Sequence, residues 1–239
     1  MILTIKEIQD IETEIVKEVT DICKRNNIDY FLHCGSALGA IRHGGPIPWD
    51  SDVDIIVPND QYIFFLEKVR ADISDKYIVD YYDINPYFTP LFIRIGLKGY
   101  STMRLHIDVF KLIGISSDKK EQIQITKKLK LLSKVYFAKT ATSKYRGNIP
   151  LKRKVTNYIY RAVFIFKKLS SIRNEFEEIC NTTPYAQAQY VTNPSGHYGL
   201  KNILPKMYYN KGVIVKYSGF DVKVPEQYDL YLKHYYGDY

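Results

Sequence analysis

Residues 35–57 decide how the rest of the chain is interpreted, and they read GSALGAIRHGGPIPWDSDVDIIV. The stretch opens with Gly35 and Ser36, and it closes with aspartates at alternate positions that run into an apolar, β-branched segment. Gly44, Gly45, Pro46 and Pro48 lie between these ends and favour a loop. The pattern predicts a turn, a short helix over about 36–42, a loop, and then a buried strand over 53–57.

Three carboxylates, Asp50, Asp52 and Asp54, close this stretch. Residues two apart on an extended segment share a face, so Asp52 and Asp54 are expected to project together. Carboxylates held this close repel one another unless a cation lies among them, and oxygen ligands beside phosphate favour Mg²⁺ or Mn²⁺. Asp108 opens a later apolar strand, and pairing of the two strands would make it the third acid. The sequence therefore predicts a divalent metal site.

Phosphate binding is the second function that this stretch indicates. Gly35 and Ser36 stand at a predicted helix start, where backbone amides and a hydroxyl are available to an anion. Trp49, the only tryptophan, either stacks on a ring of the substrate or anchors the loop against the core. Further cations that could neutralise substrate charge are Arg42, His43, Arg94, Lys98, Arg104 and Lys206.

The aspartate run has two other interpretations. A calcium-binding EF-hand loop needs Gly where Ile55 stands and Glu where Gln61 stands, so this interpretation is rejected. A solvated, acidic turn is the alternative without function. The order of strand, Gly-Ser turn, short helix, loop and Asp-Val-Asp resembles the signature of polymerase-β-like nucleotidyltransferases. The fifteen residues between Ser36 and Asp52 make a long interval for that signature.

Composition limits the remaining classes of protein. The chain has 239 residues, enough for a substantial core, and its three cysteines form no CxxC pair. We expect reduced, buried cysteines in an intracellular protein, with no signal peptide and no transmembrane span. The net charge is +8, but residues 119–173 alone carry sixteen Lys or Arg against one acid. This asymmetry indicates a polyanionic partner or a solvated helical face.

Three regions are expected along the chain. Residues 1–115 form an α/β catalytic core, which begins with an amphipathic helix over 5–25 behind a Thr4/Glu7 capping box. Residues 116–182 form a basic helical region, which faces either a membrane or a substrate that accepts a transferred group. Residues 183–239 form loops and short strands that pack back on the core. The predicted fold class is α/β (α+β), with a mixed sheet and a basic helical insertion.

The basic region leaves two interpretations open. Residues 151–180 are helical in pattern, and 158–166 are apolar and aromatic between Lys and Arg. This fits either a helix lying on an anionic membrane or an ordinary core helix of a second subdomain. His33 and Cys34, in contrast, lie in an apolar strand pattern and are predicted to be buried structural residues. The role of His197 stays undecided.

The chain resembles the LicD family, on the stretch 35–55 in particular. The family pattern is close to G-T/S-L-L-G-A-x-R-H-x-G-F-I-P-W-D-D-D-I-D, and residues 107–110 (IDVF) resemble the later I-D-I-F element. The tail resembles the family too, at 205–208, 219–225, 228–232 and 235–239. This chain departs from the pattern at Ser51, where an acid is usual, and at Pro46, where a bulkier residue is usual.

The resemblance implies a nucleotidyltransferase-like fold and magnesium-dependent transfer of a substituted phosphate. Family members move phosphocholine from CDP-choline onto bacterial cell-surface glycans, and relatives such as fukutin-related protein move ribitol phosphate from CDP-ribitol. Carried over by residue, Asp52 and Asp54 would be metal ligands and Asp108 the third ligand or the base. Gly35 and Ser36 would hold donor phosphate, with Asp50 in a supporting place.

We therefore expect a metal-dependent phosphotransferase that uses a CDP-alcohol, with CDP-choline favoured, on a glycan or lipid-linked glycan. Glycerol- or ribitol-phosphate transfer is the near alternative. A nucleotidyltransferase that transfers NMP and a non-catalytic membrane- or polyanion-binding module are the others. No nucleic acid partner is expected. The implied location is the cytoplasm of a bacterium, at the inner face of the membrane, with contact through 119–173.

Overall fold

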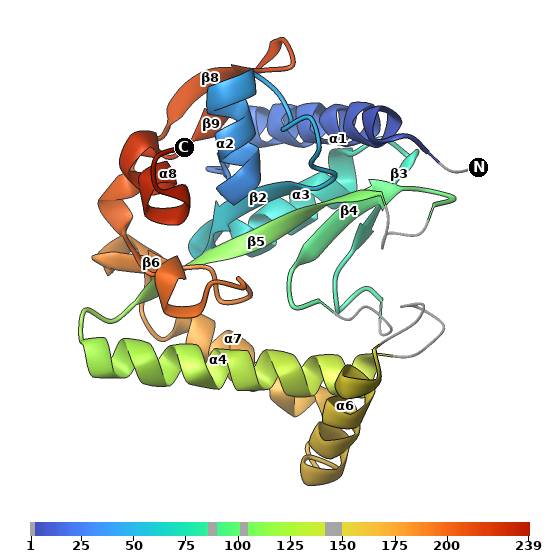
Figure 1. Cartoon of the computed structure of the whole chain (residues 1–239), viewed down its shortest axis with the longest axis vertical. Helices are drawn as coiled ribbons and strands as arrows, with labels where there is room; N and C mark the ends of the chain where they lie inside the picture. The colour runs from blue at the N-terminus through green and yellow to red at the C-terminus, as the bar shows by residue number, and fades with distance from the viewer. Residues whose placement is uncertain (1–2, 86–89, 101–104, 142–149) are drawn as a thin grey trace.

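In the computed structural model, residues 3–85, 90–100, 105–141 and 150–239 are described. A mixed sheet lies at the centre, with α1 across one side and α4, α6 and α7 at the opposite end (Figure 1). The helices are α1 (Ile5–Arg25), α2 (Cys34–His43), α3 (Tyr62–Asp72), α4 (Lys119–Thr140), α6 (Leu151–Val163), α7 (Leu169–Asn181) and α8 (Tyr228–Tyr236). The strands are β1 (Phe31–Leu32), β2 (Val53–Pro58), β3 (Tyr77–Asp80), β4 (Ile93–Leu97), β5 (His106–Ile115), β6 (Tyr190–Thr192), β7 (Leu204–Pro205), β8 (Val213–Tyr217) and β9 (Phe220–Val224).

The sheet has the order β1-β2-β5-β4-β3, and β6 and β7 extend it from the far end of β5. β2 and β5 are parallel, and the other neighbours are antiparallel. β5 is the longest strand because its first half pairs with β4 and its last residues pair with β6. This mixed sheet with helices confirms the predicted α+β class and is consistent with a nucleotidyltransferase-like core.

The first helix begins as the sequence predicts, and a sharp turn leads from β1 into α2. Thr4 caps α1, and the side chain of Glu7 accepts from the Thr4 amide, which confirms the capping box. Between β1 and α2 the chain reverses at Cys34, whose φ of 45° is uncommon for a residue with a side chain. This sharp turn points the start of α2 at the ends of β2 and β5.

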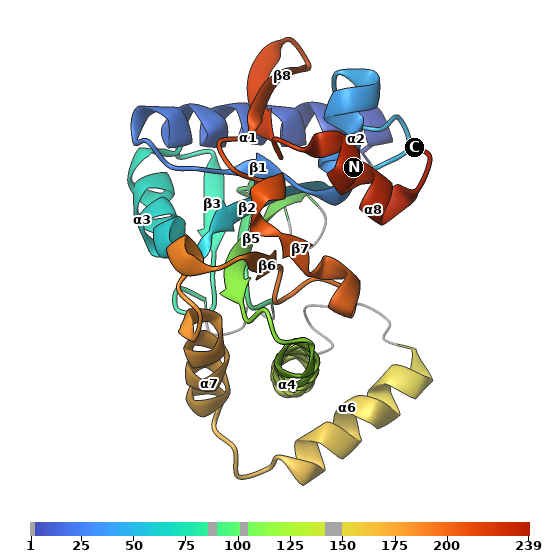
Figure 2. The same cartoon turned by 90° about the vertical axis from the view of Figure 1, so that its left-hand side faces the viewer.

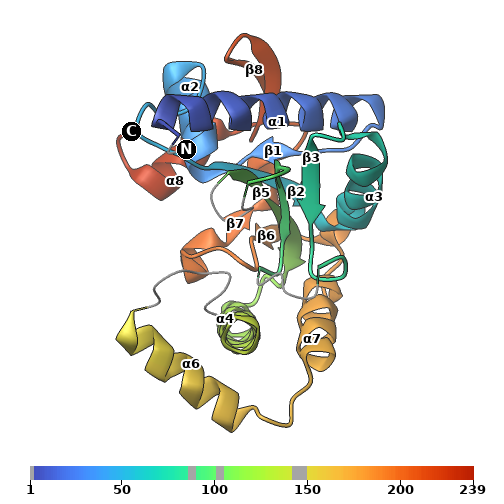
Figure 3. The ribbon, with the colours of Figure 1, turned by 90° about the vertical axis from the view of Figure 1, so that its right-hand side faces the viewer.

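The basic region forms two packed helices and one outlying helix. α4 buries one stripe against the core, and α7 buries Ile172, Phe176 and Cys180. The expected single helix over 151–180 is broken between Val163 and Leu169, and no residue of the fully described α6 is buried. α6 packs beside α4 on the side away from the sheet (Figures 2 and 3). The sequence did not predict the break.

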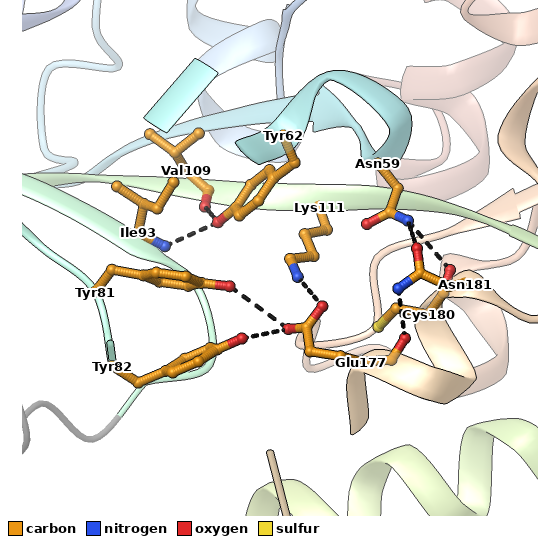
Figure 4. A network of polar contacts seen from close by, with 10 residues as sticks. All are labelled: Asn59, Tyr62, Tyr81, Tyr82, Ile93, Val109, Lys111, Glu177, Cys180 and Asn181. Carbon is orange, nitrogen blue, oxygen red and sulfur yellow. Dashed lines mark hydrogen bonds and ion pairs between the residues drawn. The ribbon is translucent and has the colours of Figure 1, made fainter. Parts of the chain in front are cut away.

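A polar network fixes α7 to the sheet (Figure 4). Lys111 of β5 is almost fully buried, and its ammonium pairs with the carboxylate of Glu177 on α7. Tyr82 donates to the other oxygen of Glu177 at 2.7 Å, and Asn59 donates to the Cys180 carbonyl. A buried ammonium needs such a partner, so these bonds hold α7 in one position.

The C-terminal residues return to the core. β6 adds to β5, the β8–β9 hairpin packs beside β1, and α8 packs against α2. The three cysteines are buried and form no disulfide. Within the described part of the chain, no helix combines the length and the apolar character needed to cross a bilayer. The division into three regions stays a prediction.

Candidate active site

A cavity of about 250 Å³ opens where β2, the start of α2 and the 193–198 segment meet. Its acidic side is formed by Asp50, Asp52 and Asp54, and Gly35 and Ser36 line it beside them. The other lining residues are His33, Cys34, Phe110, Asn193, Gly196, His197, Tyr198, Asn202 and Tyr236. The structure thus brings the two ends of the 35–57 stretch together, with loop and helix residues from the C-terminal region around them.

Asp54 and Asp108 are direct neighbours on the parallel strands β2 and β5. In that register both side chains leave the same side of the sheet, because neighbouring positions of paired strands share a face. Both carboxylates are partly shielded from solvent, and Val53, Ile55 and Ile107 beside them are buried. The strand pairing expected between Asp108 and the aspartate run is therefore present.

Asp108 is held by an arginine from the next strand. Arg94 lies opposite it on β4, and its guanidinium donates to both carboxylate oxygens, at 2.6 and 3.2 Å. The Nε2 of His106 lies 3.3 Å from one of the same oxygens. This bidentate pair orients the Asp108 carboxylate and gives it a charged partner.

Ser36 and Gly35 fit tightly against the acids. The Ser36 hydroxyl accepts from the Asp54 amide at 2.8 Å, so it ties α2 to β2 in addition to facing the cavity. A Cβ at Gly35 would lie 3.1 Å from an Asp50 oxygen, closer than most side-chain contacts. Gly35 thus leaves space for the Asp50 carboxylate.

A buried hydrogen-bond network fixes the turn before α2. The Tyr231 hydroxyl accepts from the Cys34 amide at 2.9 Å and lies 2.8 Å from His33 Nδ1. Asn193 donates to His33 Nε2 at 3.4 Å, which assigns the ring proton to Nδ1. His33 is thereby satisfied, and burial lowers its pKa to about 3. His33 and Cys34 are structural, as predicted.

Glu12 is a fifth acid of the site that sequence reasoning missed. It lies buried on α1, and its Oε1 has no hydrogen-bond partner among the described residues. Burial and the nearby carboxylates of Asp52 and Asp50 raise its pKa to about 9. The sequence carries a signal for the burial of Glu12, because this residue shares a helical stripe with the apolar residues Val16, Val19 and Cys23, which are all buried.

The carboxyl groups interact strongly. Burial first, and then the charges of Asp108, Asp52 and Asp50, raise the pKa of Asp54 well above its ordinary value. Burial and Asp52 raise the pKa of Asp50 to about 6. Burial also raises the pKa of Asp108, while Arg94 opposes that shift. Several acids therefore lie where a positive charge would be stabilising.

Carboxylate oxygens are ligands that a hard divalent cation prefers. The buried Glu12 Oε1, which has no hydrogen-bond partner in the described chain, is a further oxygen beside them. In the arrangement present, however, no three His, Cys, Asp or Glu side chains of the described residues stand close enough to enclose a metal. Arg94 occupies both Asp108 oxygens. A metal set of Asp52, Asp54 and Asp108 stays a prediction.

Several predicted substrate residues do not line the cavity. Arg42 and His43 are exposed in the last turn of α2, at the end away from Gly35. Trp49 is 74% exposed and packs its ring edge-on with His43, at 6.4 Å between centroids. These three residues lie together outside the cavity.

The other predicted cations also lie elsewhere. Lys206 donates to the carbonyls of Tyr185 and Ala186 at 2.9 and 2.7 Å, so its ammonium serves the fold. Lys98 is exposed at the end of β4, and Arg104 lies outside the described residues. His197, left undecided, is at the cavity wall, and its charge lowers the pKa of Asp108.

A mixed sheet with acids on adjacent parallel strands, beside a Gly-Ser helix start, is consistent with a nucleotidyltransferase-like fold. The family model "LicD/FKTN/FKRP, nucleotidyltransferase domain" matches residues 27–142. The chain resembles the LicD family over these residues.

Two relatives extend this comparison. The chain is 26% identical to the lipopolysaccharide cholinephosphotransferase LicD of Haemophilus influenzae over 249 residues, which cover 99% of this chain and 91% of that protein. It is 45% identical to the human ribitol 5-phosphate transferase FKRP over 42 residues, which cover 18% of this chain and 8% of that protein.

Proposed function

We propose that this protein transfers a substituted phosphate, phosphocholine from CDP-choline, to a sugar hydroxyl of a bacterial cell-surface glycan. The observation that carries this proposal is the pairing of Asp54 with Asp108 beside Ser36, at a cavity lined by two further aspartates. Similarity to the Haemophilus influenzae cholinephosphotransferase along nearly the whole chain supports the choice of phosphocholine.

The reaction forms one bond and breaks one. The acceptor oxygen bonds to the phosphorus that carries the alcohol, the bond from that phosphorus to the CMP oxygen breaks, and CMP leaves. The hydroxyl proton goes to the Asp108 carboxylate, which Arg94 keeps oriented. A base with a pKa above that of a free carboxyl suits this proton transfer, and burial raises the pKa of Asp108 in that direction.

The cation of this proposal is Mg²⁺ or Mn²⁺. Asp52 and Asp54 would hold it, with Asp108 next to them and Asp50 adding negative charge. Such an ion neutralises charge on phosphate oxygens. The amide end of α2 at Gly35 and Ser36 adds a partial positive charge toward the same cavity.

A thermal-shift screen tests the donor. Intact protein is heated with CDP-choline, CDP-glycerol, CDP-ribitol or NTPs, each with and without Mg²⁺, because a bound ligand raises the melting temperature by mass action. The proposal predicts the largest shift with CDP-choline plus Mg²⁺. The largest shift with a CDP-polyol would move the donor to glycerol or ribitol phosphate, as the similarity to FKRP allows.

Stabilisation by NTPs alone contradicts the proposal and favours NMP transfer. Absence of any shift, together with binding of the protein to a polyanion, favours the non-catalytic module instead. Asp52→Asn serves as the matched variant, since it removes one negative charge at the cavity and keeps the side-chain size. It should lose the Mg²⁺-dependent part of the shift.

We also propose that α6 holds the protein against an anionic membrane. Its outward side chains include Leu151, Val155, Tyr158, Ile159 and Val163, which are all exposed. The chain then continues into Phe166, which is 95% exposed. Core helices do not expose such a stripe, so the ordinary core-helix interpretation does not fit α6.

Charge favours anionic lipid as the partner. Lys and Arg surround the apolar side chains of α6, and the sequence has no acid between Glu121 and Glu175. Basic residues beside exposed aromatic side chains are typical of interfacial helices. Contact is assigned to α6 and residues 164–168, since α4 and α7 bury their apolar faces inside the fold.

Vesicle co-sedimentation tests this contact. The protein should bind vesicles containing phosphatidylglycerol, bind pure phosphatidylcholine vesicles much less, and lose binding at high salt. Tyr158→Ser with Phe166→Ser should abolish binding, while Ile63→Ser with Phe64→Ser, an exposed apolar pair on α3, should not. Unchanged vesicle binding by the α6 variant, or self-association through α6, would contradict the assignment.

A further inference from the structure

We propose that a second cavity binds the nucleotide part of the activated donor; this inference rests on the proposed function. The cavity, of about 350 Å³, lies between α4, α6 and the 192–202 segment. That volume lies in the range of small-molecule and cofactor sites. The nucleotide cavity, as we call it, contains none of the catalytic aspartates and stands beside them.

The nucleotide cavity and the acidic cavity have one wall in common. Asn193, Gly196, His197 and Asn202 line both cavities. A ligand with its nucleoside and the adjacent phosphate in one cavity and its second phosphate in the other would therefore cross this short segment. A CDP-alcohol has this layout, because its nucleoside and its reacting phosphorus are separated by one phosphate.

The charge of the nucleotide cavity is opposite to that of the acidic cavity. Lys130, Lys134 and Arg153 line it, and no Asp or Glu is among its described lining residues. Cations at this place suit the phosphate next to the nucleoside. The acids across the wall, in contrast, suit a cation.

Two buried polar atoms of the nucleotide cavity lack partners. Asn202 is 3% exposed, and the Tyr235 hydroxyl donates to its Oδ1 at 3.3 Å, which directs its Nδ2 elsewhere. This Nδ2, like the hydroxyl of Ser133, has no hydrogen-bond partner in the described chain. Buried donors without partners are rare, so both atoms indicate a polar ligand.

The remaining lining suits a flat heterocycle. The guanidinium of Arg153 lies over the Phe137 ring at 4.4 Å, and Tyr160 adds a second aromatic ring. Thr156 and Asn157 bring hydrogen-bonding groups from α6. Planar cations and aromatic rings stack on nucleobases, and amides read base edges. A phosphate site alone would not need these groups.

Calorimetric titration of the intact protein with CMP tests this site without any acceptor. We expect Lys134→Ala and Asn157→Ala each to weaken CMP binding about tenfold, the loss expected for one charged or buried polar contact. Lys127→Ala, an exposed change on the same helix outside the cavity, should leave it unchanged. Equal CMP affinity in all variants would overturn the proposal.

Two further measurements distinguish a nucleotide from other ligands of this cavity. Cytidine and ribose 5-phosphate should each bind more weakly than CMP; equal binding of ribose 5-phosphate would reduce the cavity to a phosphate site and overturn the proposal. Lost acceptor binding with normal CMP binding in the same variants would assign the cavity to the acceptor instead. Because CMP titration needs no turnover, failure of transfer with intact, cavity-dependent CMP binding contradicts only the proposed function.

Discussion

Among single residues, the proposed chemistry depends most on the contact between Arg94 and Asp108. The guanidinium donates to both carboxylate oxygens, and its positive charge opposes the upward shift of the Asp108 pKa that burial causes. A lysine keeps the charge but not the two-pronged geometry, because an ammonium is a point charge.

Arg94→Lys should therefore lower kcat by about tenfold or more, a loss of roughly 1.4 kcal/mol in transition-state stabilisation. Arg94→Met should in addition raise the pKa of Asp108, since the opposing charge is gone. A base must be ionised to act, so the acid limb of the pH–rate profile should move to higher pH in Arg94→Met. Profiles of kcat/KM against pH measure this, and an unmoved acid limb would argue against Asp108 as the base.

His33 makes stability depend on pH. Burial lowers its pKa to about 3, whereas an unfolded histidine titrates near 6.5. Between these values only the unfolded state takes up the proton, so the His33 contribution to stability is lost as the pH falls from about 6.5 toward 3. The loss between pH 7 and pH 4 should be about 3 kcal/mol.

Denaturant unfolding of wild type and His33→Gln at several pH values isolates this contribution. The difference in free energy of unfolding should shrink as the pH falls, because the variant lacks the titrating ring. His43→Gln is the matched control on an exposed histidine and should run parallel to wild type. A His33→Gln curve that also runs parallel would rule out a neutral, buried His33.

The roles of single residues followed from the sequence only where local pattern determines them. Alternation along 50–54 and one apolar strand were enough to expect Asp54 beside Asp108. Asn193 and Tyr231 reach the site from distant parts of the chain, which no local pattern encodes, whereas the buried stripe of α1 did carry a signal for Glu12. Arg42 and Trp49 belong to the predicted motif, yet Arg42 in the last turn of α2 and Trp49 in the loop after it lie outside the cavity that Gly35 lines.

At the scale of elements, the Lys111–Glu177 pair decides how α7 docks on β5. Lys111 is 2% exposed, while Glu177 keeps about a quarter of its side chain in solvent. Lys111→Met should leave Glu177 without its cation in a partly buried place and destabilise the protein by about 3 kcal/mol. The double variant Lys111→Met with Glu177→Gln should recover part of this loss.

Chemical unfolding of the single and double variants provides the measurement. Lys216→Met is the matched control, since Lys216 pairs with Asp221 on the surface and such pairs contribute about 0–1 kcal/mol. Strictly additive effects of the Lys111 and Glu177 variants would contradict a direct coupling between β5 and α7.

Element prediction succeeded where periodicity and capping agree, as in α1 with its Thr4 cap. It was wrong over 151–180, where the hydrophobic pattern continues through a break that only tertiary packing imposes. The same pattern could not separate a core helix from an interfacial one, because both have an apolar stripe. Burial alone distinguishes them, and α6 buries none of its residues.

At the scale of the whole molecule, the site depends on segments that are far apart in the sequence and meet in space. The C-terminal α8 places Tyr231 under the start of α2, and β6 leads into the 193–202 segment that separates the two cavities. Sequence reasoning expected the tail to pack back on the core but gave it no function beyond the family resemblance. The 193–202 segment of this tail lies between the acidic cavity and the nucleotide cavity and lines both.

Product analysis by ³¹P NMR tests the central claim most directly. Protein, Mg²⁺, CDP-choline and a bacterial surface glycan are incubated, and the phosphorus species are followed with wild type and with Asp54→Asn. The account predicts free CMP and a new phosphodiester on the glycan with wild type, and neither with a folded Asp54→Asn protein. A nucleotide joined to the glycan, or equal turnover by Asp54→Asn, would contradict it.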